Sequence, residues 1–453
     1  MQQPPLTPIE TSEDGSRQSF LLNIGPSHPA MHGIIRINVD LDGETIRKAE
    51  VEIGYLHRAF EKDAEHVSWN GVMPYTDRLN YVSPLLNNFG YCMAVEKLLG
   101  VRPPERAEYI RVVLGEISRL ADHLTCVGAS AMEVGAFTAF LYFMQAREHA
   151  YELIEDVTGA RVTVSYGRVG GVRADLPEGF AAKARECFKI IRALLKETDQ
   201  LLTKNRIFFD RFRGTCPITR ELALDYGMMG PWLRSTGVAH DLRKAEPYAV
   251  YDRVQFEVPT GEAGDNYDRY RVRMAEMEQS IRICEQCFDQ MTAGGVRTPV
   301  PAEYLDAAAM VDAAKHARTA GLIHCEAKLS PNLEGQGAEH KAAVIAGGPP
   351  VAMPPLGKTY GSIEGLMNHF MLVMENQGIQ PPAGDAYAAV EGANGELGFY
   401  VVSNGTGRPW RVRVHSPCFV IMAALEELLP GHMIADLIVT FGSVNMIGGE
   451  LDR

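Results

Sequence analysis

The stretch "PPERAEYIRVVLGEISRLADHL", residues 103–124, decides the fold class of this chain. It opens with two prolines and an acidic first turn, which is typical of the start of a helix. It then places apolar residues at helical spacing along one face, namely Ile110, Val113, Leu114, Ile117, Leu120, Ala121 and Leu124. Such a face is stable only when it is buried against other elements, so the stretch predicts a helix that packs in a bundle.

Similar patterns predict further helices over residues 138–158, 177–203, 265–291 and 362–377. Strands with tight turns are predicted between residue 19 and about residue 55. In "IIRINVDLDG" (34–43) apolar and polar residues alternate before an Asp-Gly turn. "GELGFYVVSNGTGRPWRVRVH" (395–415) predicts a hairpin around an Asn-Gly turn, followed by a short helix and a loose tail, "GSVNMIGGELDR" (442–453). The expected fold is α+β and mainly α.

Composition divides the chain into five segments. Residues 1–18 are polar and Pro-rich, as in a flexible leader, and residues 19–83 form a β-rich region. Residues 84–294 are expected to form the helical bundle core, and residues 354–453 a C-terminal α/β region. Between them, residues 295–353 are rich in Ala, Gly and Pro, which is typical of an insertion, here of unknown role.

The charge and cysteine content exclude several classes of protein. A net charge of −13 argues against a nucleic-acid binder and against electrostatic attachment to anionic lipid. Eight scattered cysteines without a secretory signal give no disulfide framework and fit a reducing cytosol. The apolar segment 124–146 carries one charge, Glu133, and is expected to be a buried core helix and not a membrane span. The Glu133 carboxyl group there needs a partner or a proton.

Several cofactor motifs are incomplete. "AMPPLGKT" (352–359) lacks the first glycine of a phosphate-binding loop, and its two prolines lack N–H groups. "GQGAEH" (335–340) lacks the third glycine of a dinucleotide fingerprint. Cys284 and Cys287 form a single Cys-x-x-Cys inside an amphipathic helix, which favours a structural role. No cofactor bound by this chain can be identified from its own motifs, and no metal site is expected.

The segment "GPSHPAMHG", residues 25–33, places His28 and His32 four residues apart. That spacing puts two histidines on one face only in a helix, and Pro26 and Pro29 disfavour a helix here. The histidines are therefore expected on a loop between strands. From these residues alone, a metal pair, a proton-handling residue and an ordinary turn residue all remain open.

The same loop, followed by "IGYLHRAFEK" (53–62) and "YTDRLNYVSPLLNNFGYCMAVEKLLG" (75–100), resembles the family of quinone-site subunits of respiratory complex I. The resemblance continues through "GGVRADLP" (170–177), "STGVAHDLRKAEPY" (235–248) and "GELGFYVVS" (395–403), and omits only the leader and the insertion. It implies the helix bundle of the related large subunit of nickel–iron hydrogenases. Asn80, Ser83, Ile447 and Glu450 stand where those enzymes have thiolate ligands, so no nickel–iron site is expected.

By this resemblance, His32 and Tyr81 reach a quinone head group from opposite sides and donate hydrogen bonds as charge develops. Glu133 stands where the family has an aspartate that pairs with the histidine, while His28 is left as a turn residue. Arg78, together with Arg58, is expected near a 4Fe–4S cluster of the neighbouring small subunit. Thr163 occupies the position of a cluster-facing histidine.

The resemblance implies a subunit of the proton-pumping NADH:quinone oxidoreductase that is inactive alone. Electrons from NADH would pass through FMN and iron–sulfur clusters on other subunits to quinone bound here. Expected partners are the small subunit and membrane-arm subunits, on the cytoplasmic side of the bacterial inner membrane and without nucleic acid. Two alternatives stay open: the equivalent subunit of a proton-pumping complex fed by ferredoxin or a deazaflavin cofactor, and a scaffold without chemistry.

Overall fold

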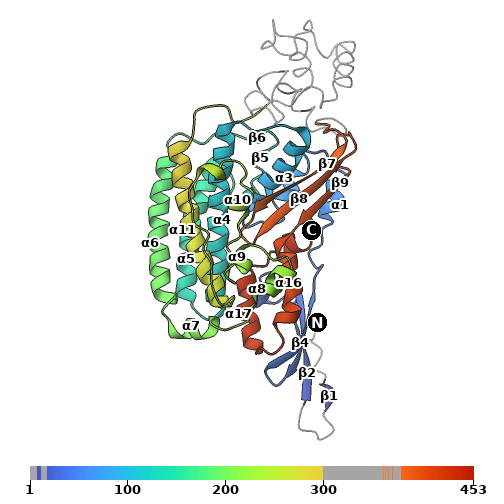
Figure 1. The fold of residues 1–453 in the computed structure, drawn as a ribbon, viewed down its shortest axis with the longest axis vertical. Coiled ribbons are helices and arrows are strands. Elements are labelled where there is room, and N and C mark those ends of the chain that lie inside the picture. Colours follow the sequence, from blue (N-terminus) through green and yellow to red (C-terminus); the bar gives the residue numbers. More distant parts are fainter. Residues whose placement is uncertain are drawn as a thin grey trace.

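A computed structural model describes residues 8–11, 18–298 and 379–453, with Gly361, Ile363, Leu366 and Phe370 between them (Figure 1). Of the predicted helix 362–377, only Ile363, Leu366 and Phe370 are described, and all three are helical. Residues 299–353 of the predicted insertion fall outside the described ranges. The described part is helical in the main and carries three small sheets, which confirms an α+β fold dominated by helices. Across the described residues, no helix has both the length and the apolar content needed to cross a bilayer.

The N-terminal sheet is antiparallel, in the order β1 (Pro8–Thr11), β2 (Gln18–Ile24), β3 (Arg36–Asp42) and β4 (Thr45–Glu52). The predicted alternation is confirmed, because Ile37, Val39 and Leu41 of β3 are buried. Asp42 pairs with Thr45 across the predicted Asp-Gly turn. Strand β1 shows that residues 8–11 of the predicted leader 1–18 are paired: Pro8 lies opposite Phe20, since the edge of β2 offers unpaired backbone groups.

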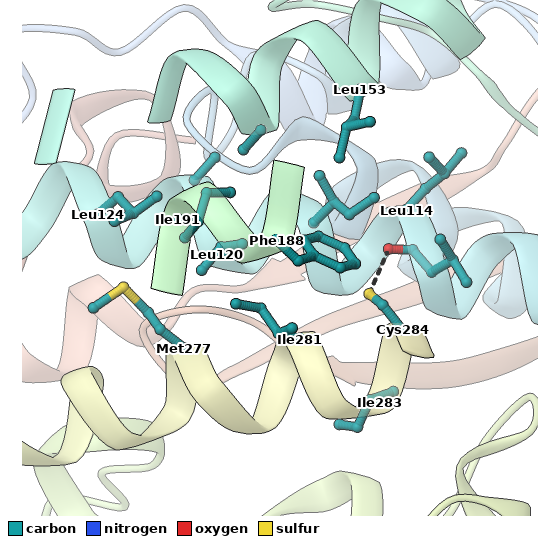
Figure 2. Packing of buried hydrophobic residues seen from close by; sticks show 14 of the residues in the cluster. Leu114, Leu120, Leu124, Leu153, Phe188, Ile191, Met277, Ile281, Ile283 and Cys284 are labelled. Atoms are coloured by element: carbon teal, nitrogen blue, oxygen red, sulfur yellow. Dashed lines mark hydrogen bonds between the residues drawn. The ribbon is translucent and has the colours of Figure 1, made fainter. Parts of the chain in front are cut away.

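The helical bundle contains α4 (Glu105–Glu133), α5 (Phe137–Thr158), α6 (Phe180–Leu202) and α11 (Asn266–Gln290), which run side by side in Figure 1. The predicted helices 103–124, 138–158, 177–203 and 265–291 are thus confirmed. Figure 2 shows how they interlock: Leu114, Leu120 and Leu124 of α4 meet Leu153 of α5, Phe188 and Ile191 of α6, and Met277 and Ile281 of α11. Each such buried side chain contributes about 1.5–3 kcal/mol.

The apolar segment 124–146 is not the single buried helix that was predicted. Helix α4 ends at Glu133 and α5 begins at Phe137. Gly135 lies between them with φ +83, a left-handed conformation that glycine adopts without strain. The turn leaves Phe137 and Leu141 more than half exposed and places Glu133 at the end of the bundle, where it is accessible from outside.

The C-terminal sheet has the order β7 (Gly384–Glu391), β8 (Glu396–Ser403) and β9 (Arg411–His415), and it packs on α3 (Pro84–Leu99). The predicted hairpin of β8 and β9 is confirmed. Strand β7 extends it and was not predicted. A Cβ atom on Gly90 of α3 would lie 3.0 Å from Phe399 and 3.3 Å from Val390, so glycine permits the close approach of helix and sheet.

The loose tail 442–453 is a further correction. Helix α16 (Pro417–Leu428) is followed by α17 (Ile434–Val444) and α18 (Gly448–Leu451), and α18 is buried. The Asp452 carboxylate accepts hydrogen bonds from the backbone N–H groups of Gly54 (2.9 Å) and Leu56 (2.8 Å). These long-range bonds order a segment whose own sequence has weak local preferences.

Shorter elements connect these units: α1 (Phe60–Ala64), α2 (Met73–Thr76), β5 (Gly167–Arg168), β6 (Gly171–Val172), α7 (Arg206–Phe212), α8 (Arg220–Asp225), α9 (Gly230–Arg234), α10 (Leu242–Ala245), and the 3-10 turns η1 (Pro29–Met31) and η2 (Tyr251–Arg253).

The two cysteines of the Cys-x-x-Cys motif, Cys284 and Cys287, are both buried in the bundle core. Burial raises the pKa of both thiols, that of Cys287 to about 12.

A buried charge cluster ties the bundle to the C-terminal sheet. The Glu116 carboxylate of α4 forms ion pairs with the guanidinium groups of Arg243, at 3.0 Å, and Arg119, at 3.3 Å. Arg119 also donates a hydrogen bond to the backbone carbonyl of Gly392 (2.7 Å). Burial alone would raise the pKa of Glu116, but the two guanidinium groups hold it at about 2. The cluster therefore stays ionised and fixes the sheet against α4.

Candidate functional site

The loop between β2 and β3 separates the roles of its two histidines. His28 caps the turn η1, with its Nδ1 accepting the backbone N–H of Ala30 at 3.3 Å. His32 ends that turn in a left-handed conformation, φ 49, so the histidines share no helical face. The two residues therefore have different local partners, and His28 has the turn role that was predicted.

His32 turns instead toward the end of α4. Its Nε2 lies 2.8 Å from Oε1 of Glu133, and the side chains are 18% and 12% exposed. The ring also meets Phe441 of α17 edge-on, at 6.4 Å between centroids. The segment 124–146 thus supplies its one carboxylate to a histidine 101 residues earlier in the chain. A hydrogen-bonded, partly exposed imidazole–carboxylate pair can hold and transfer a proton.

Tyr81 follows α2 and is partly buried. Burial raises the pKa of the phenol, the Arg58 guanidinium lowers it, and the Asp122 carboxylate raises it. The phenol therefore stays protonated near neutral pH. Within the part of the chain that the structure describes, its hydroxyl group has no hydrogen-bond partner, so it is free to donate to a ligand.

A buried polar cluster lies beneath Tyr81. Asp122 of α4 accepts hydrogen bonds from Asn80 Nδ2 (3.1 Å), Ser83 Oγ (2.6 Å) and Asn445 Nδ2 (2.7 Å). Asn80 and Ser83 are two of the four positions that the sequence comparison sets against hydrogenase thiolates. Both donate to the Asp122 carboxylate, and the Cys418 thiol lies in the same network, 3.7 Å from the carbonyl of Asn445.

Glu450, a third such position, accepts from Ser416 Oγ and from the backbone N–H of Cys418, both at 3.1 Å. Burial raises the pKa of its carboxyl group. Ile447, the fourth position, is a buried apolar residue. The polar cluster was not predicted as part of the site. On a helix, Asp122 lies off the apolar face that runs through Ala121 and Leu124, so the periodic pattern gave no signal that its carboxylate would be buried.

Two arginines lie together at a surface pocket of about 470 Å³ that also includes Tyr75 and Pro74. Arg58 Nη2 donates to the carbonyl of Arg78 at 2.6 Å, and Arg78 Nη1 donates to the carbonyl of Pro74 at 2.5 Å. The Arg78 side chain is 45% exposed. Both positive charges therefore face outward, where an anionic group on another chain can reach them.

The segment that carries Thr163 is tied to the same loop. Asp77, next to Arg78, is fully buried and accepts the backbone N–H of Ser165 at 2.8 Å and Asn88 Nδ2 at 2.6 Å. Burial raises the pKa of Asp77, opposed by these hydrogen bonds. Thr163 itself has φ 55, an uncommon conformation for a β-branched residue. The hydrogen bonds of Asp77 thus bring the segment 163–165 next to Arg78, and Asp77 is a positioning residue that was not predicted.

Comparisons with known proteins give consistent results. Residues 133–453 match the family described as respiratory-chain NADH dehydrogenase, 49 Kd subunit. The D subunit of the NADH-quinone oxidoreductase of Myxococcus xanthus is 48% identical over 434 residues, covering 96% of this chain and 92% of that protein. A D subunit of the same enzyme from Sorangium cellulosum is 46% identical and covers 98% of both chains. The fused C/D subunit of Bdellovibrio bacteriovorus is 44% identical, covering 95% of this chain and 68% of that protein.

Proposed function

This chain belongs to the 49-kDa subunit family of the respiratory-chain NADH dehydrogenase, and from that membership we propose that it binds the head group of a quinone between His32 and Tyr81. It is a subunit of an oxidoreductase complex and is proposed to be inactive alone. The observation that carries the proposal is the pair of a carboxylate-bound imidazole and a free, protonated phenol. Two donors suit a quinone, which has two carbonyl acceptors.

The bond between His32 and Glu133 defines what the imidazole can do. When Nε2–H donates to the Glu133 carboxylate, Nδ1 of a neutral ring is only an acceptor. Only the imidazolium form has a second N–H, on Nδ1, to donate to a quinone carbonyl. Glu133 is therefore proposed to fix the orientation of the ring through Nε2, which leaves Nδ1 to face a quinone carbonyl, and its side chain takes this role where the family has aspartate.

Proton balance follows from the same groups. Two electrons and two protons convert the quinone to the quinol. One proton comes from Nδ1 of the His32 imidazolium and one from the Tyr81 hydroxyl, and both residues regain protons from solvent. The electrons would be supplied by a 4Fe–4S cluster held by the neighbouring small subunit. On this chain, the outward guanidinium groups of Arg58 and Arg78 fit a negatively charged neighbour.

Further expectations about architecture, location and neighbouring subunits belong to this proposal. The helix bundle is proposed to share the architecture of nickel–iron hydrogenase large subunits, and the segments 19–83, 84–294 and 354–453 are proposed as its structural regions. The chain is proposed to lie peripherally on the cytoplasmic side of the inner membrane, with the small subunit and membrane-arm subunits as neighbours. The fused C/D relative supports a further neighbour, the C subunit of the same complex.

NADH is proposed as the electron source of the complex, through FMN and iron–sulfur clusters on other subunits. The names of the relatives support this over ferredoxin or a deazaflavin cofactor. Oxidation of NADH by the purified complex, with quinone as acceptor, distinguishes these donors. Failure to use NADH while reduced ferredoxin supports turnover would favour the second candidate.

A double-mutant cycle tests the His32–Glu133 pair. His32→Ala, Glu133→Gln and the double variant are compared in the assembled complex by kcat/KM for a short-chain quinone. If the Glu133 carboxylate acts through the His32 imidazole, the double variant should lose little more kcat/KM than His32→Ala alone. The coupling free energy between the two positions should then exceed about 1 kcal/mol. Additive losses would contradict the proposal, and a scaffold without chemistry would show no loss in any variant.

A further inference from the structure

A group of potential metal ligands lies between α5 and α6, apart from the proposed quinone site, with two partly exposed members and one buried member. His149 and Glu152 are one turn apart on α5, and Cys187 faces them from α6. One donor atom of each lies within 4.8 Å of the others, and His149 Nδ1 is 3.5 Å from Glu152 Oε2. Within the described residues, no other group of three or more histidine, cysteine or acidic side chains is as close.

The thiol of Cys187 differs from most other buried thiols of the chain. Cys284 donates to the carbonyl of Val113 at 3.5 Å, and Cys418 donates to the carbonyl of Asn445 at 3.7 Å. Cys187 is also buried, yet among residues 18–298 and 379–453 it has no hydrogen-bond partner. Its sulfur is therefore available to a ligand that approaches from the His149 side.

The charges around this sulfur favour a cation. Burial raises the pKa of the Cys187 thiol, and the carboxylates of Glu152, Asp156 and Glu186 raise it further. Lys183 is the cation that opposes them, and it is ion-paired with Asp156. The local field is thus negative, which attracts a divalent cation and disfavours a bare thiolate.

We propose that His149, Glu152 and Cys187 form a binding site for Zn²⁺ or a similar thiophilic divalent cation. An imidazole, a carboxylate and a thiolate are the ligand types of zinc, at about 2.0–2.3 Å, whereas Mg²⁺ and Ca²⁺ prefer oxygen alone. Water supplies the fourth ligand. The donors must close by about 1 Å, which the partly exposed His149 and Glu152 side chains allow by rotation.

The binding step balances as a proton exchange. Zn²⁺ replaces the proton of the Cys187 thiol, one zinc–sulfur bond forms, and the proton goes to solvent. No oxidant or reductant takes part. The ion then joins α5 to α6, the helices that contribute Leu153 and, from α6, Phe188 and Ile191 to the core cluster in Figure 2.

The test uses the purified complex with zinc chloride as the probe. After chelation and back-titration, zinc content is measured for wild type, Cys187→Ser and Glu152→Gln, together with X-ray absorption at the zinc edge. The wild type is expected to retain about one zinc ion more per complex than either variant. A difference spectrum against Cys187→Ser should contain a sulfur neighbour at about 2.3 Å.

Glu186→Gln is the matched control, since it removes the same charge from an exposed side chain that pairs with Lys189 at 2.7 Å. It should keep the extra zinc, because Glu186 raises the pKa of Cys187 but is not a proposed ligand. If the complex with Cys187→Ser fails to assemble, His149→Asn tests the same site, because it changes a partly exposed residue. Equal zinc content in wild type and His149→Asn, or equal loss in Glu186→Gln and Glu152→Gln, would overturn the proposal.

Discussion

Tyr81→Phe removes one oxygen from the proposed quinone site and leaves the ring in place. Because the Tyr81 hydroxyl has no hydrogen-bond partner among the described residues, its removal leaves no buried group unpaired. The stability of the complex should therefore change by less than about 0.5 kcal/mol. Any larger effect on turnover must come from the lost donor.

The expected kinetic effect follows from the proposed role of the phenol. Losing one hydrogen-bond donor to an oxygen that gains negative charge costs about 2.7–4 kcal/mol in the transition state. Quinone-dependent kcat should therefore fall by about 10²–10³-fold. Because burial raises the pKa of Tyr81 above its usual value of 10.0, the phenol stays protonated at moderately alkaline pH, and the factor should be the same at about pH 6 and pH 9.

The assay compares two reactions of the same purified complex. NADH with a short-chain quinone requires the quinone site, and NADH with ferricyanide, which accepts electrons upstream, measures assembly. Tyr91→Phe is the matched control, because Tyr91 is fully buried and its hydroxyl donates to the carbonyl of Trp69 at 2.8 Å. That variant should be about 1–3 kcal/mol less stable but turn over quinone normally once assembled.

Two results would refute the reasoning. Unchanged quinone turnover in Tyr81→Phe would remove the phenol from the mechanism. An equal fall in the quinone and ferricyanide reactions would show that Tyr81 serves assembly, as Tyr91 is expected to do.

Three other predictions concern regions outside this pair. Excision of the predicted insertion, residues 295–353, should leave quinone reduction largely intact, because we expect it to lie on the surface away from the quinone site; loss of quinone binding on excision would contradict this. The potential of the neighbouring 4Fe–4S cluster should vary little with pH, and Thr163→His should steepen its slope toward about 59 mV per pH unit in a potentiometric titration followed by electron paramagnetic resonance; an unchanged slope would mean that Thr163 does not face the cluster. Glu116→Gln should lower stability by about 3–5 kcal/mol in thermal inactivation, because the buried Arg119 loses the carboxylate that it pairs with and Arg243 keeps only Asp241. Since the pKa of Glu116 is held at about 2 in the folded chain, its contribution is present above pH 4.5 and lost as pH falls toward 2, and a stability profile without this acid loss would contradict that account.

The long helices could be predicted because their sequence period matches their burial. The face that begins at Ile110 is buried along its whole length, and the alternation in β3 is equally direct. Strand β7 could not be predicted in this way: "GDAYAAVE" has three alanines and two acidic residues, a composition with little strand preference. Pairing with β8 and packing on α3 decide its conformation, and neither contact can be read from the strand's own sequence.

Two other errors also arose because the local sequence pattern does not show the deciding feature. Helices α4 and α5 are separated at a single left-handed residue, Gly135, and the apolar sequence pattern continues on both sides of it. The tail, residues 442–453, was expected to be loose, and it contains three glycines. A Cβ atom on Gly449 would lie 2.2 Å from the carbonyl oxygen of Arg78, so this glycine marks close packing and not flexibility.

At the site, the candidate residues could be predicted from the sequence, but their hydrogen-bond partners depend on the fold. The separate roles of His28 and His32 follow from the turn η1 and from Glu133, which is 101 residues away from His32 in the chain. Asp77 was missed because nothing in "YTDRLN" shows that its carboxylate would bind Ser165. Buried polar residues next to predicted site residues are the signal to follow in such cases.

The most direct test of the central proposal is a structure of the purified complex with a bound quinone analogue. The proposal predicts one carbonyl oxygen within about 2.6–3.2 Å of the Tyr81 hydroxyl and the other within the same range of His32, with Glu133 still bonded to the imidazole. A head group that binds out of reach of both side chains, or that displaces Glu133 from His32, would contradict it.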